Sequence, residues 1–235
     1  MGIAYDAVSN SGHQAKETTT YNWDHTCTGT GLVLLVHASV KATGVGGFVT
    51  VSAVTCDDVP FALIDRQQSW DMDAELWRLY SPAAGTHVIK VILSEAGVSG
   101  DGSHAVALSL TGADSVEASG KNTTYNATLP ITVITATANA WIVTGVFKES
   151  YNTDPTVDLG TIAWRSPDWS GPGAAMAYYG PVATPGAVTI TWGPAETLRF
   201  SGVGAAIKPM AAPPAAAAHG RKHRIMKRVR YFVRP

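Results

Sequence analysis

The strongest concentration of charge in this sequence is the C-terminal segment "RKHRIMKRVRYFVRP" at 221–235. Seven of its residues are Lys or Arg, and none is Asp or Glu. Apolar side chains are interleaved with the charges, so the segment has an apolar stripe both as a helix and as a strand. The residues expected to contact a partner are Arg221, Lys222, Arg224, Ile225, Met226, Lys227, Arg228, Val229, Arg230, Tyr231, Phe232, Val233 and Arg234.

Three kinds of partner fit a basic amphipathic segment: a grooved or acidic protein surface, nucleic acid, and a membrane surface. The whole chain has 17 Lys and Arg against 18 Asp and Glu, so removing the seven basic residues of the segment leaves ten against 18, a charge of −8. An acidic body repels nucleic acid, and a simple solvated charge run has no need of the apolar stripe. We therefore expect a protein partner, with nucleic acid and membrane disfavoured.

A second group with functional chemistry is aromatic. Aromatic faces in loops bind sugar rings by apolar contact, and neighbouring polar groups take the hydroxyls. The side chains considered for glycan contact are Trp70, Trp164 and Trp169, of which Trp169 lies among turn residues in "SPDWSGPG". Trp77 is instead expected between two sheets of the core.

The acidic stretch "DRQQSWDMDAELW" at 65–77 raises the question of a cation site. It contains Asp65, Asp71, Asp73 and Glu75 but lacks the Gly that a calcium loop uses at its sharp turn. A solvated acidic edge, which discourages strand pairing with neighbours, is the expectation. No metal and no cofactor are predicted.

Catalytic motifs are missing from the sequence. The histidines form no HxH or HExxH pattern, no GxSxG elbow is present, and "GVGG" lacks the Lys of a phosphate-binding loop. No pair of carboxylates stands out for glycoside hydrolysis. We expect a protein that is not an enzyme.

Two cysteines, Cys27 and Cys56, fit no metal-ligand spacing, and either a disulfide or two buried free thiols agrees with their positions beside predicted strands. The first residues, "MGIAYDAVSN", have neither a basic start nor an apolar run. We therefore expect synthesis in the cytoplasm without a signal peptide.

The elements that must position these side chains are predicted to be strands. In "GAVTITWG", Val188, Ile190 and Trp192 alternate with threonines, which is the period of a half-buried strand. The apolar runs "GLVLLVHASV" from Gly31 and "AWIVTGVF" from Ala140 indicate central strands covered on both faces. Clusters of Gly, Pro, Asp and Ser separate about a dozen such segments, which favours an antiparallel sandwich.

We find no boundary and no internal repeat within 1–208, so this range is predicted to be one β-sandwich domain. The stretch "KPMAAPPAAAAHG" loses the strand pattern, and 209–220 is predicted to be a Pro/Ala-rich linker. The basic anchoring arm then occupies 221–235.

The middle of the chain contains, in order, "GLVLLVHASV", "ELWRLYSPAAGTHVIKVIL", "HAVALSLTGADSVEA" and "PGAVTITW" followed by "GVGAAIKP". In the order and spacing of these segments, the chain resembles a jelly-roll-like β-sandwich family of bacteriophage virion proteins. Similar sequences often carry an Asn-Gly turn where this chain has "TCDDVPF". The resemblance implies a jelly-roll-like sandwich on the virion surface and supplies no catalytic residue. It also implies a decoration or head-associated protein that its arm binds to a major capsid or other virion protein. Self-association is left open. The alternative is a tail-fibre or carbohydrate-binding module that recognises a host glycan.

Overall fold

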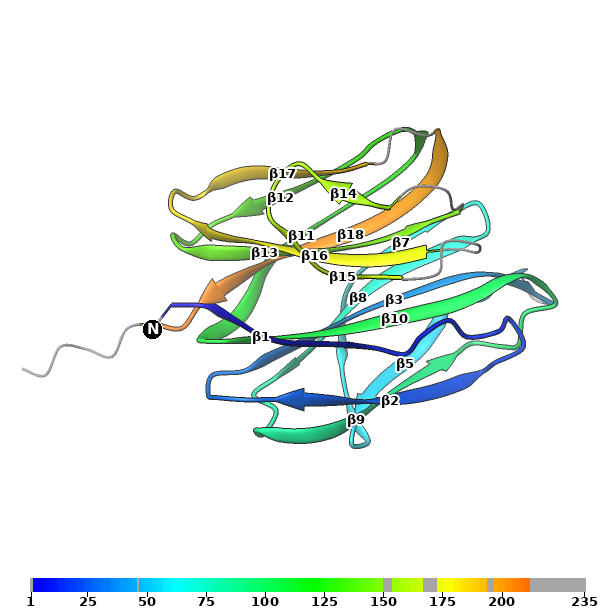
Figure 1. Ribbon diagram of the computed structural model, residues 1–235, viewed down its shortest axis with the longest axis horizontal. Helices are drawn as coiled ribbons and strands as arrows, with labels where there is room; N and C mark the ends of the chain where they lie inside the picture. The colour runs from blue at the N-terminus through cyan, green and yellow to red at the C-terminus, as the bar shows by residue number, and fades with distance from the viewer. Residues whose placement is uncertain (1, 46, 150–153, 167–172, 194–196, 212–235) are drawn as a thin grey trace, which may run out of the picture.

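The computed structural model describes residues 2–45, 47–149, 154–166, 173–193 and 197–211, and every element in these ranges is a β-strand (Figure 1). Each pair of neighbouring strands is antiparallel. The predicted class, an all-β antiparallel sandwich, is confirmed. Within the described residues there is no helix with the length and apolarity that a membrane crossing requires.

The N-terminal half of the chain forms two sheets. The N-inner sheet has the order β1-β10-β3-β8-β7, with β4 paired to β3, and the N-outer sheet has the order β2-β9-β5-β6. The strands are β1 (Ala4–Asn10), β2 (Thr20–Cys27), β3 (Val33–Gly44), β4 (Gly47–Phe48), β5 (Val51–Cys56), β6 (Val59–Pro60), β7 (Ala62–Ser69), β8 (Met72–Tyr80), β9 (Gly85–Leu93) and β10 (Ser99–Thr111).

The C-terminal half forms two more sheets. The C-inner sheet has the order β11-β18-β13-β16-β15, and the C-outer sheet has the order β12-β17-β14. The strands are β11 (Ala113–Asn126), β12 (Leu129–Thr135), β13 (Ala140–Lys148), β14 (Thr156–Val157), β15 (Thr161–Arg165), β16 (Gly173–Val182), β17 (Gly186–Gly193) and β18 (Leu198–Pro209).

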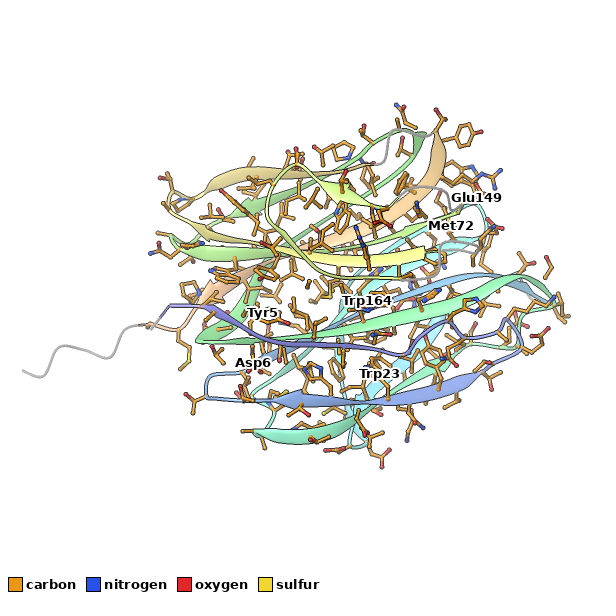
Figure 2. All side chains as sticks on the ribbon, viewed as in Figure 1. Tyr5, Asp6, Trp23, Met72, Glu149 and Trp164 are labelled. Carbon is orange, nitrogen blue, oxygen red and sulfur yellow. The ribbon has the colours of Figure 1, made fainter. Side chains whose placement is uncertain are left out.

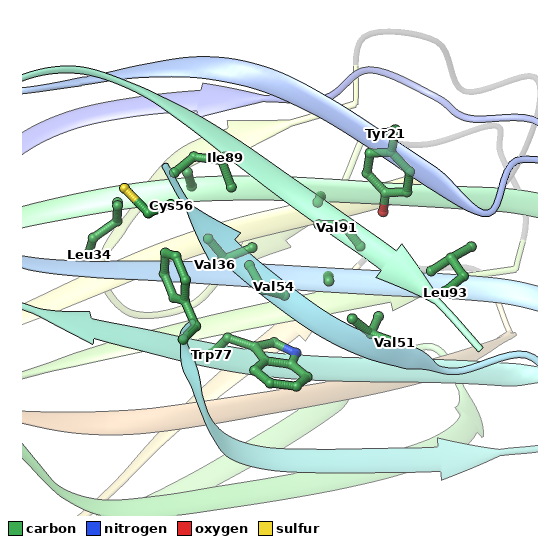
Figure 3. Packing of buried hydrophobic residues seen from close by; sticks show 14 of the residues in the cluster. Tyr21, Leu34, Val36, Val51, Val54, Cys56, Trp77, Ile89, Val91 and Leu93 are labelled. Carbon is green, nitrogen blue, oxygen red and sulfur yellow. The ribbon is translucent and has the colours of Figure 1, made fainter. Parts of the chain in front are cut away.

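The four sheets lie on top of one another as layers, from β2 and β9 at the bottom of Figure 1 to β12 and β17 at the top. Three large apolar clusters and one small one fill the spaces between them. The first lies between the two N-terminal sheets and includes Val36, Trp77 and Val91 (Figure 3). The second joins the two inner sheets, and the third lies between the two C-terminal sheets. The predicted core position of Trp77 is confirmed, since only 8% of this residue is exposed.

The two halves repeat the same strand order. In each half the first strand pairs with the last, the last also pairs with the third, and the second pairs with the second-last. A single sandwich over 1–208 is therefore too simple a description, because the strands form two sandwiches stacked through their inner sheets. The alternation of apolar and polar residues indicates which side chains are buried but not which sheet covers them. The duplicated strand order could therefore not be predicted from the sequence.

The two longest apolar runs became equivalent strands of the two halves. The strand β3 holds "VLLVHASV" and β13 holds "AWIVTGVF", and both are buried along nearly their whole length. Their prediction as central strands covered on both faces is confirmed. The inner sheets are apolar on both faces because each is sandwiched between two other layers. The predicted half-buried alternation in β17 is also present, with Ile190 and Trp192 buried and Thr189 exposed.

The body of the protein ends slightly beyond the predicted boundary. β18 continues to Pro209, and the Met210 amide donates a hydrogen bond to the Gly112 carbonyl, with an N···O distance of 2.9 Å. Gly112 lies between β10 and β11, where the two halves meet. The predicted linker from residue 212 onward lies outside the described residues.

Candidate functional site

The predicted anchoring arm at 221–235 lies entirely outside the described residues, so each of its contact residues stays a prediction. The structure does describe where the chain leaves the body. A cavity of about 430 Å³ lies beside this point and is lined by Ile3, Trp141, Pro181, Pro209 and Met210, among others. The chain therefore enters the linker next to an apolar hollow at the junction of the halves.

A stack of three aromatic rings crosses the same junction. Tyr178 on β16 lies between Tyr5 on β1 and Trp141 on β13, with ring centroids 5.4 Å from each. Tyr5 belongs to the N-inner sheet, whereas the other two belong to the C-inner sheet, so the stack joins the two halves. Figure 2 shows Tyr5 on β1, on the side of that strand that faces the C-inner sheet. Because the ring faces are used against one another, this is a packing feature rather than a sugar platform.

Two of the three tryptophans predicted for glycan contact are described by the structure, and they lie in different environments. Trp70 is 39% exposed and occupies the turn between β7 and β8, with a positive φ of 54°. Trp164 on β15, which is labelled in Figure 2, is partly buried and packs against the cluster of Met72, Ala74, Phe147 and Ala174. Trp169 lies outside the described residues. Of the predicted set, Trp70 alone is described as presenting an exposed ring.

Trp70 stands in a group of charges at one end of the stacked sheets. The Arg199 guanidinium lies 5.5 Å from the centre of the Trp70 ring, a cation–π contact. Arg199 also lies 3.8 Å from Asp71 and 3.3 Å from Glu149, and Lys41 lies 3.8 Å from Glu149. An exposed aromatic ring flanked by hydrogen-bonding groups of both signs can bind a polar ring such as a sugar.

The acidic stretch is not the solvated edge that the sequence predicts. Glu75 is 0% exposed and Asp73 is 1% exposed, both inside the N-terminal sandwich. Arg66 Nη2 lies 2.6 Å from Glu75 Oε1, and the Trp77 indole N–H donates to Glu75 Oε2 at 2.7 Å. Alternation along β8 places Asp73, Glu75 and Trp77 on the face toward the N-outer sheet, and Arg66 on β7 reaches in to neutralise the carboxylate. Two buried adjacent carboxyls cannot reach a glycan, so they do not form a glycosidase pair.

Burial and the neighbouring Glu75 carboxyl raise the pKa of Asp73 to about 9. Burial therefore favours the protonated form of the Asp73 carboxyl, whose pKa lies well above that of an ordinary aspartate. The remaining acids of the stretch are ion-paired: Asp65 lies 2.8 Å from Lys121 of β11, and Asp71 contacts Arg199 as described above. Both pairs join the N-terminal half to the C-terminal half.

A hydrogen-bonded chain of serine, histidine and aspartate lies between β1, β2 and β10. Ser9 Oγ is 2.8 Å from His25 Nδ1, His25 Nε2 is 3.1 Å from Ser109 Oγ, and Ser109 donates to Asp6 at 2.7 Å. The order differs from a hydrolytic triad, because the carboxylate contacts the serine instead of the histidine. His25 is 1% exposed, and burial lowers its pKa to about 4. The network links β1, β2 and β10 through side-chain hydrogen bonds.

The two cysteines are buried free thiols, which settles the alternative that the sequence left open. Cys56 nevertheless belongs to a group that sequence spacing did not reveal. Its thiol, the Asp57 carboxylate and the His87 imidazole each place one ligand-type atom within 4.8 Å of the others. His87 comes from β9, 30 residues away in the chain, so no local motif could have predicted the group.

Comparisons of the chain with protein-family models, with curated proteins and with solved structures gave no match in any of the three.

Proposed function

We propose that this chain is a non-enzymatic structural protein of a bacteriophage virion, a capsid decoration or head-associated surface protein held to a major structural protein by its C-terminal arm. The observation that carries the proposal is the strand order of the two halves. Pairing of first with last strand and second with second-last strand supports a jelly-roll-like fold, because a jelly roll built from two Greek keys is expected to have this nested order. Jelly rolls are a recurring fold of viral capsid proteins.

The way the arm is joined to the body supports an anchoring role. β18 lies between β11 and β13; it pairs with β13 up to Ile207 and, through two register shifts, with β11 up to Pro209. A load applied through the arm reaches a central strand, whose release would require two ladders of hydrogen bonds to break together. An arm that starts from a sheet edge would detach one ladder at a time.

The charge distribution supports the same role. The body carries −8 and the arm +7, as counted from the sequence. Electrostatic attraction would then speed the encounter with an acidic site on the partner, while the apolar stripe of the arm would determine how long the complex lasts. The acidic body would face solvent on the virion surface and resist nonspecific self-association.

The test uses particles assembled without this chain and the full-length protein, mixed and sedimented across a salt series. Replacement of Val229, Phe232 and Val233 by Ser should abolish co-sedimentation even at low salt. Replacement of Arg228 and Arg230 by Gln should mainly slow binding and flatten its salt dependence. Co-sedimentation that survives the triple replacement contradicts the anchoring proposal, and so does binding to bare DNA in place of particles at physiological salt.

A second candidate function, recognition of a host glycan as a tail-fibre or carbohydrate-binding module, is favoured by the exposed ring of Trp70 beside Arg199. Jelly rolls also occur among lectin domains. This candidate predicts that host surface polysaccharide shifts tryptophan fluorescence in the full-length chain and in Trp164→Phe but not in Trp70→Phe. An unchanged spectrum in the full-length chain over a broad polysaccharide panel removes this candidate.

A further inference from the structure

The hairpin that joins β5 to β6 has an unusual turn. Cys56 pairs with Val59, and the two residues between them, Asp57 and Asp58, have φ values of 47° and 65°. Two consecutive positive φ values form a type I′ turn, for which Asn-Gly is the favoured sequence. The expected hairpin is thus present although "CDDV" replaces Asn-Gly. Asp tolerates this region better than most residues, so both positions can adopt the turn.

Each carboxylate of this turn has a defined partner on β9. The Val88 amide donates to Asp57 Oδ1 at 2.8 Å, and His87 Nδ1 lies 2.7 Å from Asp57 Oδ2. Lys90 donates to Asp58 Oδ1 at 2.6 Å. These contacts orient the Asp57 carboxylate so that one oxygen is held by the backbone and the other points to the imidazole.

The Cys56 thiol completes a set of three ligand types. Cys56 is the last residue of β5, Asp57 is the first residue of the turn, and His87 lies on the adjacent β9, which pairs with β5. One ligand atom from each lies within 4.8 Å of the other two. Thiolate, imidazole and carboxylate together are the ligands of Zn²⁺, and three protein ligands with a fourth open position form a common zinc arrangement.

Hydrogen bonds with neighbouring backbone groups hold His87 and Asp57 in orientations that would suit metal ligands. His87 Nε2 lies 2.8 Å from the Ala83 carbonyl, so this nitrogen carries the proton and leaves Nδ1 for a metal. The Val88 amide fixes the second oxygen of Asp57 in the same way. The Asp57 Oδ2 to His87 Nδ1 separation would widen only to about 3.3 Å in a tetrahedral site with ~2.0 Å bonds.

The group is also reachable from solvent. Cys56 is 3% exposed, yet it lines a cavity of about 280 Å³ together with Asp57, His87, Leu79, Pro82 and Ala83. Asp57 lines this cavity and is itself exposed to solvent. An ion can therefore enter past Asp57 and keep a water molecule as its fourth ligand.

A bound cation would change which protonation states of Cys56 and His87 are favoured. Burial, Asp57 and Cys27 together raise the pKa of the Cys56 thiol to about 11, while the hydrogen bond to Asp57 raises the pKa of His87. A divalent cation favours the thiolate and the neutral imidazole instead. Binding releases the thiol proton and the Nδ1 proton to solvent, and the Cys56 sulfur and His87 nitrogen donate the freed electron pairs to the metal.

We propose that Cys56 Sγ, Asp57 Oδ2 and His87 Nδ1 form a zinc-binding site that joins the β5–β6 turn to β9 in the N-outer sheet. The site is independent of the proposed virion role. It lies on β5, the β5–β6 turn and β9 of the N-outer sheet, whereas β18, which precedes the arm, belongs to the C-inner sheet.

The test is a titration of the full-length chain with Co²⁺, which produces thiolate-to-cobalt charge-transfer absorption only when sulfur is a ligand. His219 and His223 lie four residues apart in the C-terminal region and can bind metal themselves, so all proteins carry His219→Gln and His223→Gln. We expect one equivalent of Co²⁺ to produce the absorption and Zn²⁺ to displace it. Cys56→Ser should abolish the band, and Cys27→Ser, which alters the other buried thiol, should retain it.

Two conservative variants test the remaining ligands. Asp57→Asn keeps a residue that tolerates the turn geometry, and His87→Gln keeps a polar side chain on β9; each should weaken Co²⁺ binding by about tenfold or more, the loss typical even of outer-shell partners. Zinc should raise the melting temperature of the parent and of Cys27→Ser but not of Cys56→Ser. Absence of the band in the parent, or its persistence in Cys56→Ser, overturns the proposal.

Discussion

Arg66 Nη2 lies 2.6 Å from Glu75 Oε1, so a guanidinium that is one-third exposed compensates a carboxylate that is fully buried between two sheets. Arg66 Nη2 also donates to the Val51 carbonyl at 3.0 Å, and the Val51 amide donates to Glu75 at 3.2 Å. The ion pair thus ties β7 and β8 of the N-inner sheet to β5 of the N-outer sheet. The ion pair therefore links the same two sheets that the apolar core around Val51 and Trp77 joins (Figure 3).

Removal of Arg66 should therefore destabilise the fold strongly. Arg66→Ala leaves Glu75 charged and buried, and we expect a loss of about 3 kcal/mol in the free energy of unfolding, measured by urea denaturation. Lys16→Ala is a matched control, because Lys16 has the same side-chain exposure of 33% but pairs with the exposed Glu17. The control should lose about 0.5 kcal/mol or less. Equal losses in the two variants would show that the Glu75 carboxylate does not depend on Arg66.

Asp73 should make the protein less stable as the pH rises. Its pKa is raised from an ordinary value of 3.8 to about 9 by burial and by the Glu75 carboxyl, so the folded state retains a proton that the unfolded chain releases. This contribution is fully present below pH ~4 and declines as the pH rises toward 9, by at most about 1.4 kcal/mol per pH unit. Urea midpoints of the parent and of Asp73→Asn at pH 5, 7 and 9 test this. The parent should lose stability relative to the variant with increasing pH, and parallel profiles would exclude a shifted Asp73.

The buried histidines should act in the opposite pH range. Burial lowers the pKa of both His25 and His37 from 6.5 to about 4, so stability that is present above pH ~6.5 is lost as the pH falls toward 4. His87 differs, because its hydrogen bond to Asp57 raises its pKa. An NMR titration of the ring protons should show His87 titrating above 6.5 and the two buried rings remaining neutral at pH 5. Titration of His37 near its ordinary pKa would contradict the packing described for it.

Close approach of the two halves should make Gly145 sensitive to a single added carbon. A Cβ on Gly145 of β13 would lie 2.3 Å from Cγ of His37, which is fully buried on β3. His37 cannot move easily, since its ring nitrogens contact the Glu75 and Val146 carbonyls. Gly145→Ala should cost roughly 1–3 kcal/mol by overpacking, measured as a lower denaturation midpoint. Gly2→Ala, where a Cβ meets open space, serves as the control and should leave the midpoint unchanged.

The ion pair between Asp65 and Lys121 should contribute little despite its short distance. The Lys121 Nζ to Asp65 Oδ1 separation is 2.8 Å and links β7 to β11 across the two halves, but the Lys121 side chain is 47% exposed. A double-mutant cycle with Asp65→Asn and Lys121→Met should give a coupling free energy of about 1 kcal/mol or less. A larger coupling would mean that charge pairing, rather than the apolar contacts of the inner sheets, joins the two sandwiches.

The sequence by itself determined the class of this fold and the location of its innermost strands. Strand formation depends on local alternation and on β-branched runs, and both are readable within a few residues, as in "GLVLLVHASV" and "GAVTITWG". The separation of charge between body and arm is equally local, because it follows from composition alone. For the same reason the buried position of Trp77 was predictable, whereas the strands β1, β7, β11 and β15 have weaker apolar patterns.

Only the tertiary structure decided which sheets face one another and which polar groups meet. The duplication of strand order, the stack of Tyr5 with Tyr178, and the burial of Asp73 and Glu75 all depend on pairings between segments far apart in the chain. The group of Cys56, Asp57 and His87 depends on the register of β5 against β9. An alternating pattern fixes which face of a strand is apolar, but the identity of its neighbour results from packing of the whole core, so side chains that combine across strands carry no signal in either segment alone.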